Sequence, residues 1–530
     1  MALKEVTETV ATEETPVTVK TTHTIQCANP QSLEALPSPF ILGPLDSLVF
    51  FGIPVNIVWV YESSTAHELV PITRLQRAIS LLLDYYPHLT GRLHINSDNG
   101  IRSITRLGNG MSLFEATCDV PLSSFRNAST GQLHMPDLPA AGNALLPPWE
   151  LSLEGVQREP VFTVKHTRFA CGSVSIGMRI PHTLCAAEGF FHLYQDLAEL
   201  YRGLSTTPSN GTPTLKQPPH IQSLLAEAMV SLTPEERSAA LSFQPPGFSI
   251  PPDDAPLSTP GSSVTNAPPP MPVSGRELRF SAAELAALKA HAQPPEGSGS
   301  RSVSTFSALC AHLWQRQHVA RLTFAKEQKR PTTEITTSFL TSVNYSTKLA
   351  ECPPKYFPNA LMMPFVELDC PAEDVAAWPL WRVAQAVHSV THSISPSVAL
   401  STARWIAAQP DKSAIHQGFP AHYGAVMASA WHRFPIYSGA ELVDEGGAPV
   451  SPVLASQPFT PITLMDGLMY FLPTREAKGD VEVALALSQP LWDVLERDKE
   501  LRRFGPRESE KGRIARFRWT WYQNQGPRWT

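Results

Sequence analysis

The sequence predicts a mixed α/β (α+β) protein built as two lobes. Apparent strands and amphipathic helices interleave in both halves of the 530-residue chain, an order typical of α/β and α+β folds. One break separates the halves, because ten of the 28 residues from Pro245 to Pro272 are proline. Hydrophobic residues make up 42% of the chain, which is enough for a sizeable core on each side of that break.

The first half begins with a strand and a helix. Residues 55–61 are rich in β-branched and aromatic side chains, which favour a strand. A helix is predicted over 73–86, with Thr73 as its N-cap and Pro87 after its end. Leucine and isoleucine side chains recur along one face of this segment, so the helix should pack on a core.

Two more strands and a second helix follow in the first half. Strands are predicted over 161–169 and 174–180, separated by Cys171 and Gly172. In the later strand, valine, isoleucine and methionine alternate with serine, glycine and arginine, which is the period of a half-buried strand. From Phe190 onward, apolar side chains recur at three- and four-residue steps and predict a helix.

The proline-rich region predicts an extended connection between the lobes. Proline fixes φ and removes a backbone donor, and few large apolar side chains accompany it here. Within the connection, residues 221–241 are expected to be helical, with a helix start at Thr233 to Glu236. In the second half, a helix is predicted over 305–321 and strands over 335–343 and 481–487.

Composition narrows the class of protein. Forty-two Lys and Arg against 48 Asp and Glu give a net charge of −6, which argues against a nucleic-acid partner. Seven cysteines are scattered without a C-x-x-C pair, as in a reduced intracellular protein. The polar N-terminus lacks the apolar core of a signal peptide, and the most apolar stretch, 48–61, is too short to span a bilayer. We therefore expect a soluble, cytoplasmic protein with no membrane partner.

His182 is the candidate catalytic residue. It lies where a predicted strand ends at Pro181 and a helix begins, and such connecting loops often carry catalytic groups. Most histidines in such loops are structural, so position alone does not distinguish a catalytic base from a histidine satisfied by backbone groups.

The residues around His182 carry a family resemblance. The stretch IPHTLCAAEG (180–189) resembles the HxxxD region of the BAHD acyltransferases, which are coenzyme A-dependent enzymes of specialised metabolism. Five other segments resemble motifs of the same family in the same order: LGPLD (42–46), LLLDYYPHLTGRL (81–93), STFSAL (304–309), YFPNA (356–360) and MDG (465–467). The long proline-rich insertion is more typical of fungal than of plant members.

The resemblance implies two chloramphenicol-acetyltransferase-like lobes, each a mixed sheet with flanking helices, joined by a long crossover. A solvent channel between the lobes would hold the histidine at its middle. On this view the chain comprises a flexible N-terminal segment (1–36), a lobe with the histidine (37–205), a proline-rich crossover (206–275), a second lobe (276–504) and a tail (505–530).

The resemblance also implies the chemistry. An acyl group would pass from acyl-CoA, a co-substrate, to a hydroxyl or amine of a small metabolite, with His182 as general base. Ser429 and Trp431 match a hydroxyl residue and a tryptophan of the family, which implies oxyanion support and shaping of the acceptor pocket. Ordinary strand-and-loop packing is the alternative for both residues. The family pattern implies a monomer and requires no metal.

Two departures concern the support of the histidine. Ala186 stands where the family has the aspartate of HxxxD, and Ser346 stands where the family has the arginine that pairs with that aspartate. Losing one partner of a buried pair costs about 3–5 kcal/mol, whereas losing both can be nearly neutral. The joint loss therefore favours a natural change over a laboratory mutation. Glu188 is the nearest acidic residue; it would orient the imidazole or, more in keeping with a first helical turn, favour the helix dipole.

A third departure and two weaker signals complete the analysis. At the D-F-G-W-G motif of the family, which is chiefly structural, the expected aspartate, phenylalanine and glycine are replaced by Ala440, Glu441 and Leu442, so the change affects the local loop more than the catalyst. His388 and His392 have the spacing of two zinc ligands on a helix, but no third ligand accompanies them and no metal is expected. Basic and aromatic residues alternate over 513–529, where a surface tail is expected rather than a nucleic-acid site.

These losses leave two alternatives to acyl transfer open. The scaffold could use His182 as a base for cyclisation or isomerisation of a metabolite without coenzyme A. It could instead be a catalytically silent binding protein.

Overall fold

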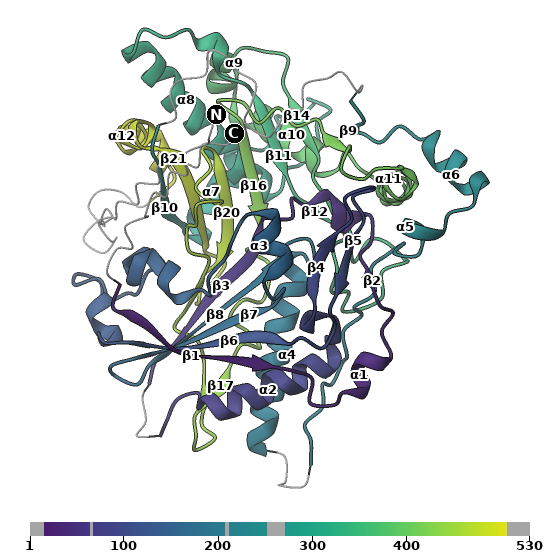
Figure 1. Cartoon of the computed structure of the whole chain (residues 1–530). Coiled ribbons are helices and arrows are strands. Elements are labelled where there is room, and N and C mark those ends of the chain that lie inside the picture. Colours follow the sequence, from purple (N-terminus) through teal and green to yellow (C-terminus); the bar gives the residue numbers. More distant parts are fainter. Residues whose placement is uncertain (1–14, 64–66, 207–210, 252–270, 477, 506–530) are drawn as a thin grey trace, which may run out of the picture.

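The structure is a computed structural model of the chain. This structure describes residues 15–63, 67–206, 211–251, 271–476 and 478–505. Two six-stranded mixed sheets form the centres of the two lobes, and Figure 1 shows them one above the other with helices on their outer faces. The predicted α/β (α+β) class with two mixed-sheet lobes is confirmed.

The first sheet is built mainly from the N-terminal half. Its order is β1 (Val17–Ile25), β6 (Met111–Cys118), β7 (Thr163–Phe169), β8 (Val174–Pro181), β3 (Pro54–Tyr61) and β19 (Leu454–Ser456). Only β6 and β7 are parallel. The last strand comes from the C-terminal half and pairs antiparallel with β3, so the first lobe depends on the second half of the chain.

The second sheet is built from the C-terminal half. Its order is β10 (Val273–Phe280), β21 (Val481–Ser488), β20 (Leu468–Pro473), β16 (Val426–Ala430), β11 (Ser338–Thr341) and β14 (Phe365–Glu367). The β20–β16 and β16–β11 pairs are parallel, and the other pairs are antiparallel.

Helices cover the outer faces of both sheets (Figure 1). On the first sheet these are α2 (Ile72–Tyr85) and α4 (Ala187–Thr206); α1 (Gln31–Glu34) contacts α2, and α3 (Leu153–Arg158) contacts β4. On the second they are α7 (Ala282–His291), α8 (Thr305–Glu327), α9 (Ala372–Ala377), α10 (Leu380–Thr391) and α12 (Gln489–Arg497). Leu313 and Trp314 of α8 are fully buried, because the long helix lies at the centre of the second core.

The remaining elements are short. A three-stranded sheet has the order β2 (Phe40–Ile41), β5 (Arg102–Thr105) and β4 (Arg92–Ile95). Three two-residue ladders pair β12 (Val343–Asn344) with β13 (Leu361–Met362), β15 (His416–Gln417) with β9 (Phe248–Ser249), and β17 (Leu442–Val443) with β18 (Pro449–Val450). Helices α5 (Ala228–Ser231) and α6 (Pro234–Leu241) belong to the crossover, and α6 contacts α11 (Pro396–Ala408).

Three sequence predictions need correction. The 174–180 strand is buried on both faces, because residues 139–146 cover its serine–glycine–arginine side and the Leu145 carbonyl leaves no room for a Cβ at Gly177. The N-terminal segment expected to be flexible contains β1, which pairs with β6 over residues 17–25. The 221–241 helix is divided into α5 and α6, because Pro234 starts a new helix with a Thr233–Glu236 capping box.

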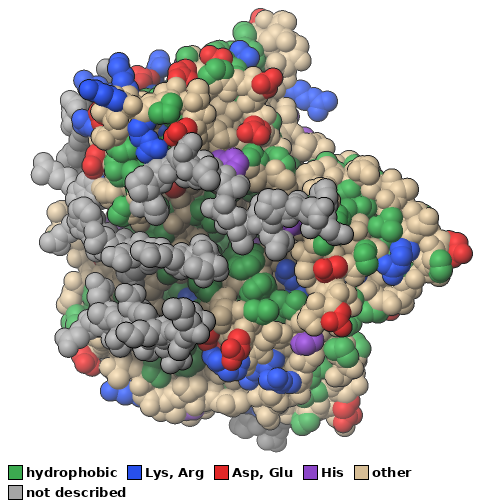
Figure 2. All heavy atoms as spheres, turned by 45° about the horizontal axis from the view of Figure 1, so that its top comes forward, with side chains coloured by type: hydrophobic (Ala, Val, Ile, Leu, Met, Phe, Trp, Pro, Cys, Tyr) green, Lys and Arg blue, Asp and Glu red, His purple; other side chains and the backbone are tan. Residues whose placement is uncertain are grey.

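The other predicted elements are confirmed with shifted ends. The 73–86 helix begins at Ile72, and its N-cap position is Pro71 rather than Thr73. The 335–343 strand is shorter, since β11 covers only 338–341. Figure 2 shows Lys and Arg interspersed with Asp and Glu on one face, in keeping with the small net charge. No helix among the described residues is long and apolar enough to pass through a bilayer.

Candidate active site

His182 follows the last residue of β8, in the loop that leads into α4. Its N–H donates to the Ile53 carbonyl and its carbonyl accepts from the Asn359 side chain, both at 2.8 Å. The residue is partly exposed, and Nδ1 of its ring is buried without a hydrogen bond to any described residue. The loop therefore fixes the backbone of His182 and leaves Nδ1 of its ring without a partner among the described residues.

The protonation state of His182 follows from its surroundings. Burial lowers its pKa below the usual 6.5, while contacts with its own backbone, the Asn359 side chain and the Cys185 backbone oppose that shift. At neutral pH the imidazole is therefore uncharged and able to accept a proton.

Asp46 and Asn359 support the histidine loop from two distant motifs. Asp46 is 1% exposed, and its carboxylate accepts the Gly43 N–H at 2.8 Å, the Asn359 N–H at 2.9 Å and the Asn359 amide at 3.0 Å. The same Asn359 amide reaches the His182 carbonyl. A chain of hydrogen bonds thus runs from the LGPLD motif through the YFPNA motif to the candidate base.

A buried cation completes this support. Arg102 of β5 donates to the Asp46 carbonyl at 3.0 Å and to the Thr183 hydroxyl at 2.8 Å, directly beside the histidine. Burial raises the pKa of Asp46 to about 6, while the hydrogen bonds from Asn359 and Gly43 oppose the shift. Burial lowers the pKa of Arg102 to about 10, and the charge of Asp46 opposes it. The charge of Asp46 therefore favours the charged form of Arg102.

Glu188 replaces the missing aspartate by a different route. Its Oε2 accepts hydrogen bonds from the Ser346 hydroxyl at 2.6 Å and from the Asn344 amide. Ala186, at the position of the family aspartate, is 4% exposed and lies in the core. Neutral donors thus face a carboxylate two residues further along the chain, so the loop and α4 are still tied to the second lobe.

The neighbouring Gly189 allows this close approach. A Cβ on Gly189 would lie 2.1 Å from the Phe357 carbonyl oxygen, so any side chain would push α4 away from the YFPNA segment. Glu188 bonds to the second lobe and not to the imidazole. The sequence did not predict this contact.

Ser429 and Trp431 lie at the end of β16 in the second lobe. Trp431 is buried and packs edge-to-face on Phe191 of α4, with ring centroids 5.7 Å apart, and on Tyr470 at 5.2 Å. Ser429 is partly exposed in the strand that precedes it. Trp431 therefore joins β16 to the helix that follows the histidine loop, while the oxyanion and pocket roles stay predictions.

The segment that replaces D-F-G-W-G is ordered against the first lobe. The Tyr61 hydroxyl donates to the Ala440 carbonyl at 2.6 Å, and Arg202 of α4 donates to the Glu441 carbonyl. Leu442 begins β17 and is buried. The changed residues keep a structural role, because their backbone carbonyls rather than their side chains make these contacts.

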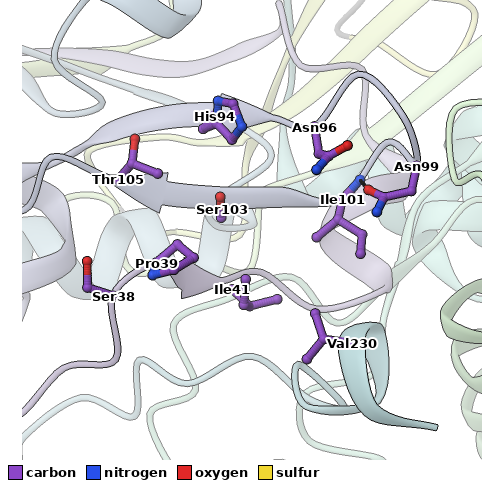
Figure 3. A pocket seen from close by; sticks show the side chains of 10 residues that line it. All are labelled: Ser38, Pro39, Ile41, His94, Asn96, Asn99, Ile101, Ser103, Thr105 and Val230. Carbon is purple, nitrogen blue, oxygen red and sulfur yellow. Dashed lines mark hydrogen bonds between the residues drawn. The ribbon is translucent and has the colours of Figure 1, made fainter.

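A groove of about 430 Å³ lies behind the loop support (Figure 3). Ser103 and Thr105 of β5 line it, with His94 of β4 and Val230 of α5. Arg102 points to the opposite side, toward Thr183, so β5 separates the groove from the histidine loop. His182 does not line this groove, and the expected channel between the lobes stays a prediction.

The weaker sequence signals lie elsewhere. The rings of His388 and His392 stack at 4.2 Å on α10, and His392 bonds to the His388 carbonyl. Among the described residues, the three possible metal ligands that converge are His134, Glu277 and Glu482, which sequence spacing did not reveal. The 513–529 segment lies outside the described residues.

Four residues of the site were not predicted from the sequence: Asp46, Asn359, Arg102 and Asn344. The first two occur in the quoted motifs, so the motifs were the available signal, although they did not tell which side chain meets which. Arg102 lies in no quoted motif, and only the fold brings it beside Asp46.

Comparison with known proteins agrees with this architecture. A family model described as the Transferase family matches residues 15–502. Shikimate O-hydroxycinnamoyltransferase of Nicotiana tabacum is 24% identical over 447 residues, 83% of this chain and 90% of that protein. (Z)-3-hexen-1-ol acetyltransferase of Arabidopsis thaliana is 23% identical over 483 residues, 86% and 89% of the two chains.

Solved structures show the same fold. Fusarium graminearum TRI101 complexed with coenzyme A and T-2 mycotoxin has a TM-score of 0.64 at 18% identity, covering 88% of this chain and 98% of that one. Vinorine synthase has a TM-score of 0.57 at 15% identity, covering 90% and 96%. Since the family model spans nearly the whole described chain, this protein belongs to the Transferase family of BAHD acyltransferases and is a transferase enzyme.

Proposed function

We propose that the enzyme transfers an acyl group from acyl-CoA to a hydroxyl or amine of a small specialised metabolite, with His182 as the general base. The observation that carries this proposal is the partly exposed, uncharged imidazole on a loop whose backbone is fixed by Ile53 and Asn359. The names of the relatives include acceptors with hydroxyls, such as shikimate and hexenol, and one with amines, spermidine. TRI101 was solved with coenzyme A.

The proposed reaction is a direct transfer. The Nε2 atom of His182 accepts the proton of the acceptor as its oxygen or nitrogen attacks the thioester carbonyl. A tetrahedral intermediate forms and collapses, breaking the carbon–sulfur bond. The departing coenzyme A thiolate takes the proton from the imidazolium, which returns His182 to its neutral state. No covalent acyl-enzyme is needed.

Two further residues have proposed roles in this step. Ser429 would donate a hydrogen bond to the developing oxyanion, and loss of such a donor typically lowers the rate by about 10²–10³. Trp431 would shape the acceptor pocket from the core position that it occupies beside Phe191. Acyl-CoA acts here as a co-substrate, and the step itself uses no metal. A monomer in the cytoplasm is the expected state.

A thioester assay tests the proposal. The purified full chain is mixed with acetyl-CoA or coumaroyl-CoA and with shikimate, (Z)-3-hexen-1-ol or spermidine, and released thiol is measured. Thiol release that depends on the acceptor supports acyl transfer. Product formed without acyl-CoA would support cyclisation or isomerisation instead. The absence of both activities would support a silent binding protein.

The His182→Ala variant tests the base. We expect its turnover to fall by at least about 10²-fold, the lower end of what a general base contributes. His388→Ala is the control, because His388 lies on α10 and stacks only on His392 among the described rings. Undiminished turnover of His182→Ala would contradict the proposed role.

A further inference from the structure

A histidine and two glutamates from three distant segments converge between the lobes. His134 precedes a short turn at residues 135–137 in the first lobe, Glu277 lies in β10 and Glu482 in β21. One ligand atom from each residue lies within 4.8 Å of the other two. All three residues are only partly exposed, so the cluster has limited contact with solvent.

The sheet register places both glutamates on one face. In the β10–β21 ladder, Glu482 is opposite Arg279, and Glu277 is two residues before Arg279 on the same strand. Side chains two residues apart on a strand point to the same side, so Glu277, Arg279 and Glu482 share the face toward His134.

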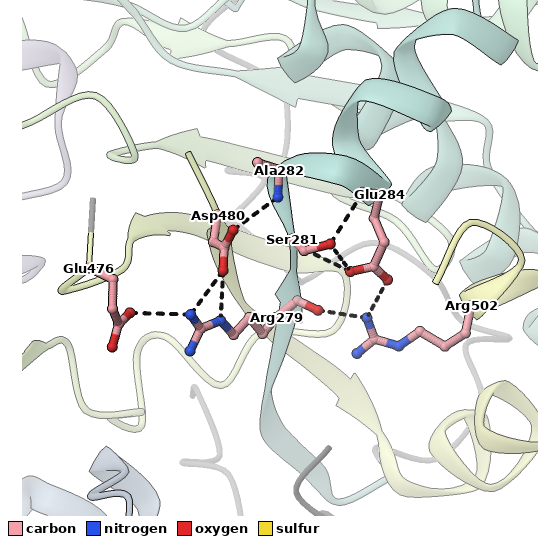
Figure 4. A network of polar contacts seen from close by, with 7 residues as sticks. All are labelled: Arg279, Ser281, Ala282, Glu284, Glu476, Asp480 and Arg502. Carbon is pink, nitrogen blue, oxygen red and sulfur yellow. Dashed lines mark hydrogen bonds and ion pairs between the residues drawn. The ribbon is translucent and has the colours of Figure 1, made fainter. Parts of the chain in front are cut away.

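The nearby arginine is engaged elsewhere. Figure 4 shows the Arg279 guanidinium turned toward Asp480 at 2.9 Å and Glu476 at 3.2 Å. His134 forms an ion pair with Glu277, and the charges of both His134 and Arg279 act on Glu482.

The three ligand atoms lie slightly farther apart than the ligands of one bound metal ion do. His134 Nδ1 lies 3.8 Å from Glu277 Oε2, which is too long for a hydrogen bond. Two ligands on one tetrahedral zinc ion, each about 2.0–2.2 Å from the metal, lie roughly 3.3 Å apart. Small side-chain rotations would therefore bring the three ligand atoms around one ion.

We propose that His134, Glu277 and Glu482 bind one divalent zinc ion that joins the first lobe to the second sheet. One imidazole and two carboxylates form a nitrogen–oxygen ligand set that suits Zn²⁺. Water occupies the fourth position. The ion clamps the loop that carries His134 onto β10 and β21, and it takes no part in acyl transfer.

Zinc binding by the full chain tests this inference. Chelator-treated protein is dialysed at pH 8 against ZnCl₂, bound zinc is counted, and the melting temperature is followed as zinc is added. We expect one ion per chain and a melting temperature that rises with zinc, since a ligand that binds the folded state stabilises it. Glu482→Gln and His134→Ala should each weaken binding at least about tenfold.

Glu115→Gln is the matched control. Glu115 pairs with His23 at 2.9 Å on the first sheet, so it offers the same residue types without a second carboxylate. This variant should bind zinc as the unchanged protein does. Zinc-free melting temperatures show whether each variant folds. Absence of zinc binding, or equal binding by all three variants, would overturn the inference.

Discussion

The side chain of Asn359 joins the buried Asp46 carboxylate to the backbone of His182, and it also contacts the imidazole. That contact raises the pKa of His182 against the larger lowering by burial. In the proposed reaction Asn359 is a positioning residue, because it would act through the histidine.

The pH profile of the reaction should reveal this role. Since the base must be uncharged, kcat/KM should fall on the acid side with a midpoint below 6.5, the usual pKa of histidine. Asn359→Ala removes a contact that raises the pKa, so its midpoint should move to lower pH while kcat falls. Profiles of both proteins, measured by thiol release, check this. A variant with the unchanged midpoint and a normal kcat would show that Asn359 only stabilises the fold.

Asp46 should make stability depend on pH. Its folded pKa of about 6 lies above the usual value near 3.9, so the folded state binds this proton more tightly than the unfolded state does. This contribution to stability is fully present below about pH 4 and is lost as pH rises to about 6. The melting temperature of the unchanged protein minus that of Asp46→Asn should therefore fall between pH 4 and 6.5. Asp98→Asn, in an exposed turn, should show no such change.

At the scale of elements, α4 is tied to the second lobe through Glu188. Its carboxylate meets Ser346 and Asn344 from the segment that follows β11. The aspartate–arginine pair of the family is thus replaced by a hydrogen-bonded carboxylate with neutral donors, which explains how both ionic partners are absent without loss of the connection.

Glu188→Ala should lower the free energy of unfolding by about 1–3 kcal/mol, because two partly buried donors lose their acceptor. Urea unfolding measures it. Glu235→Ala is the control, since Glu235 is an exposed first-turn carboxylate on α6 and reports the helix-dipole effect alone.

Ala186→Asp should lower the free energy of unfolding by about 3–5 kcal/mol, because it introduces an unpaired buried charge. Adding Ser346→Arg should recover part of that loss in the double variant. Equal loss in the single and double variants would contradict this reading.

At the scale of the whole molecule, the two lobes share cores and strands. β19 comes from the second half of the chain yet completes the first sheet beside β3. Trp431, Ile436 and Leu442 of the second half belong to the hydrophobic core of the first lobe. The first half therefore lacks some of the side chains that its lobe buries, whereas the core of the second lobe comes from the second half alone.

The N-terminal half should not fold alone. A fragment ending at residue 251 would expose the β3 edge and the apolar surface that the second half covers, so we expect it to aggregate when expressed by itself. Co-expression with residues 271–530 should give a soluble complex, and the intact chain should melt in one calorimetric transition. A monomeric, cooperatively folded first fragment would contradict this expectation.

Local patterns in the sequence determined much of the fold. The 305–321 helix, the 174–180 strand and the capping box at Thr233 follow from periodicity and side-chain chemistry that act within a few residues. The histidine at the end of β8 and its family motifs were also visible in the sequence. The burial of both faces of β8 was not, because residues 139–146 cover it from outside the strand.

Only the tertiary structure decided which distant residues meet. Asp46 and Asn359 are 313 residues apart, Glu188 and Ser346 are 158 apart, and each pair forms hydrogen bonds. The insertion of β19 into the first sheet and the His134–Glu277–Glu482 cluster are of the same kind. Periodicity predicts which face of a segment is buried. These contacts depend instead on how the two lobes pack together, which the residues of one segment do not determine.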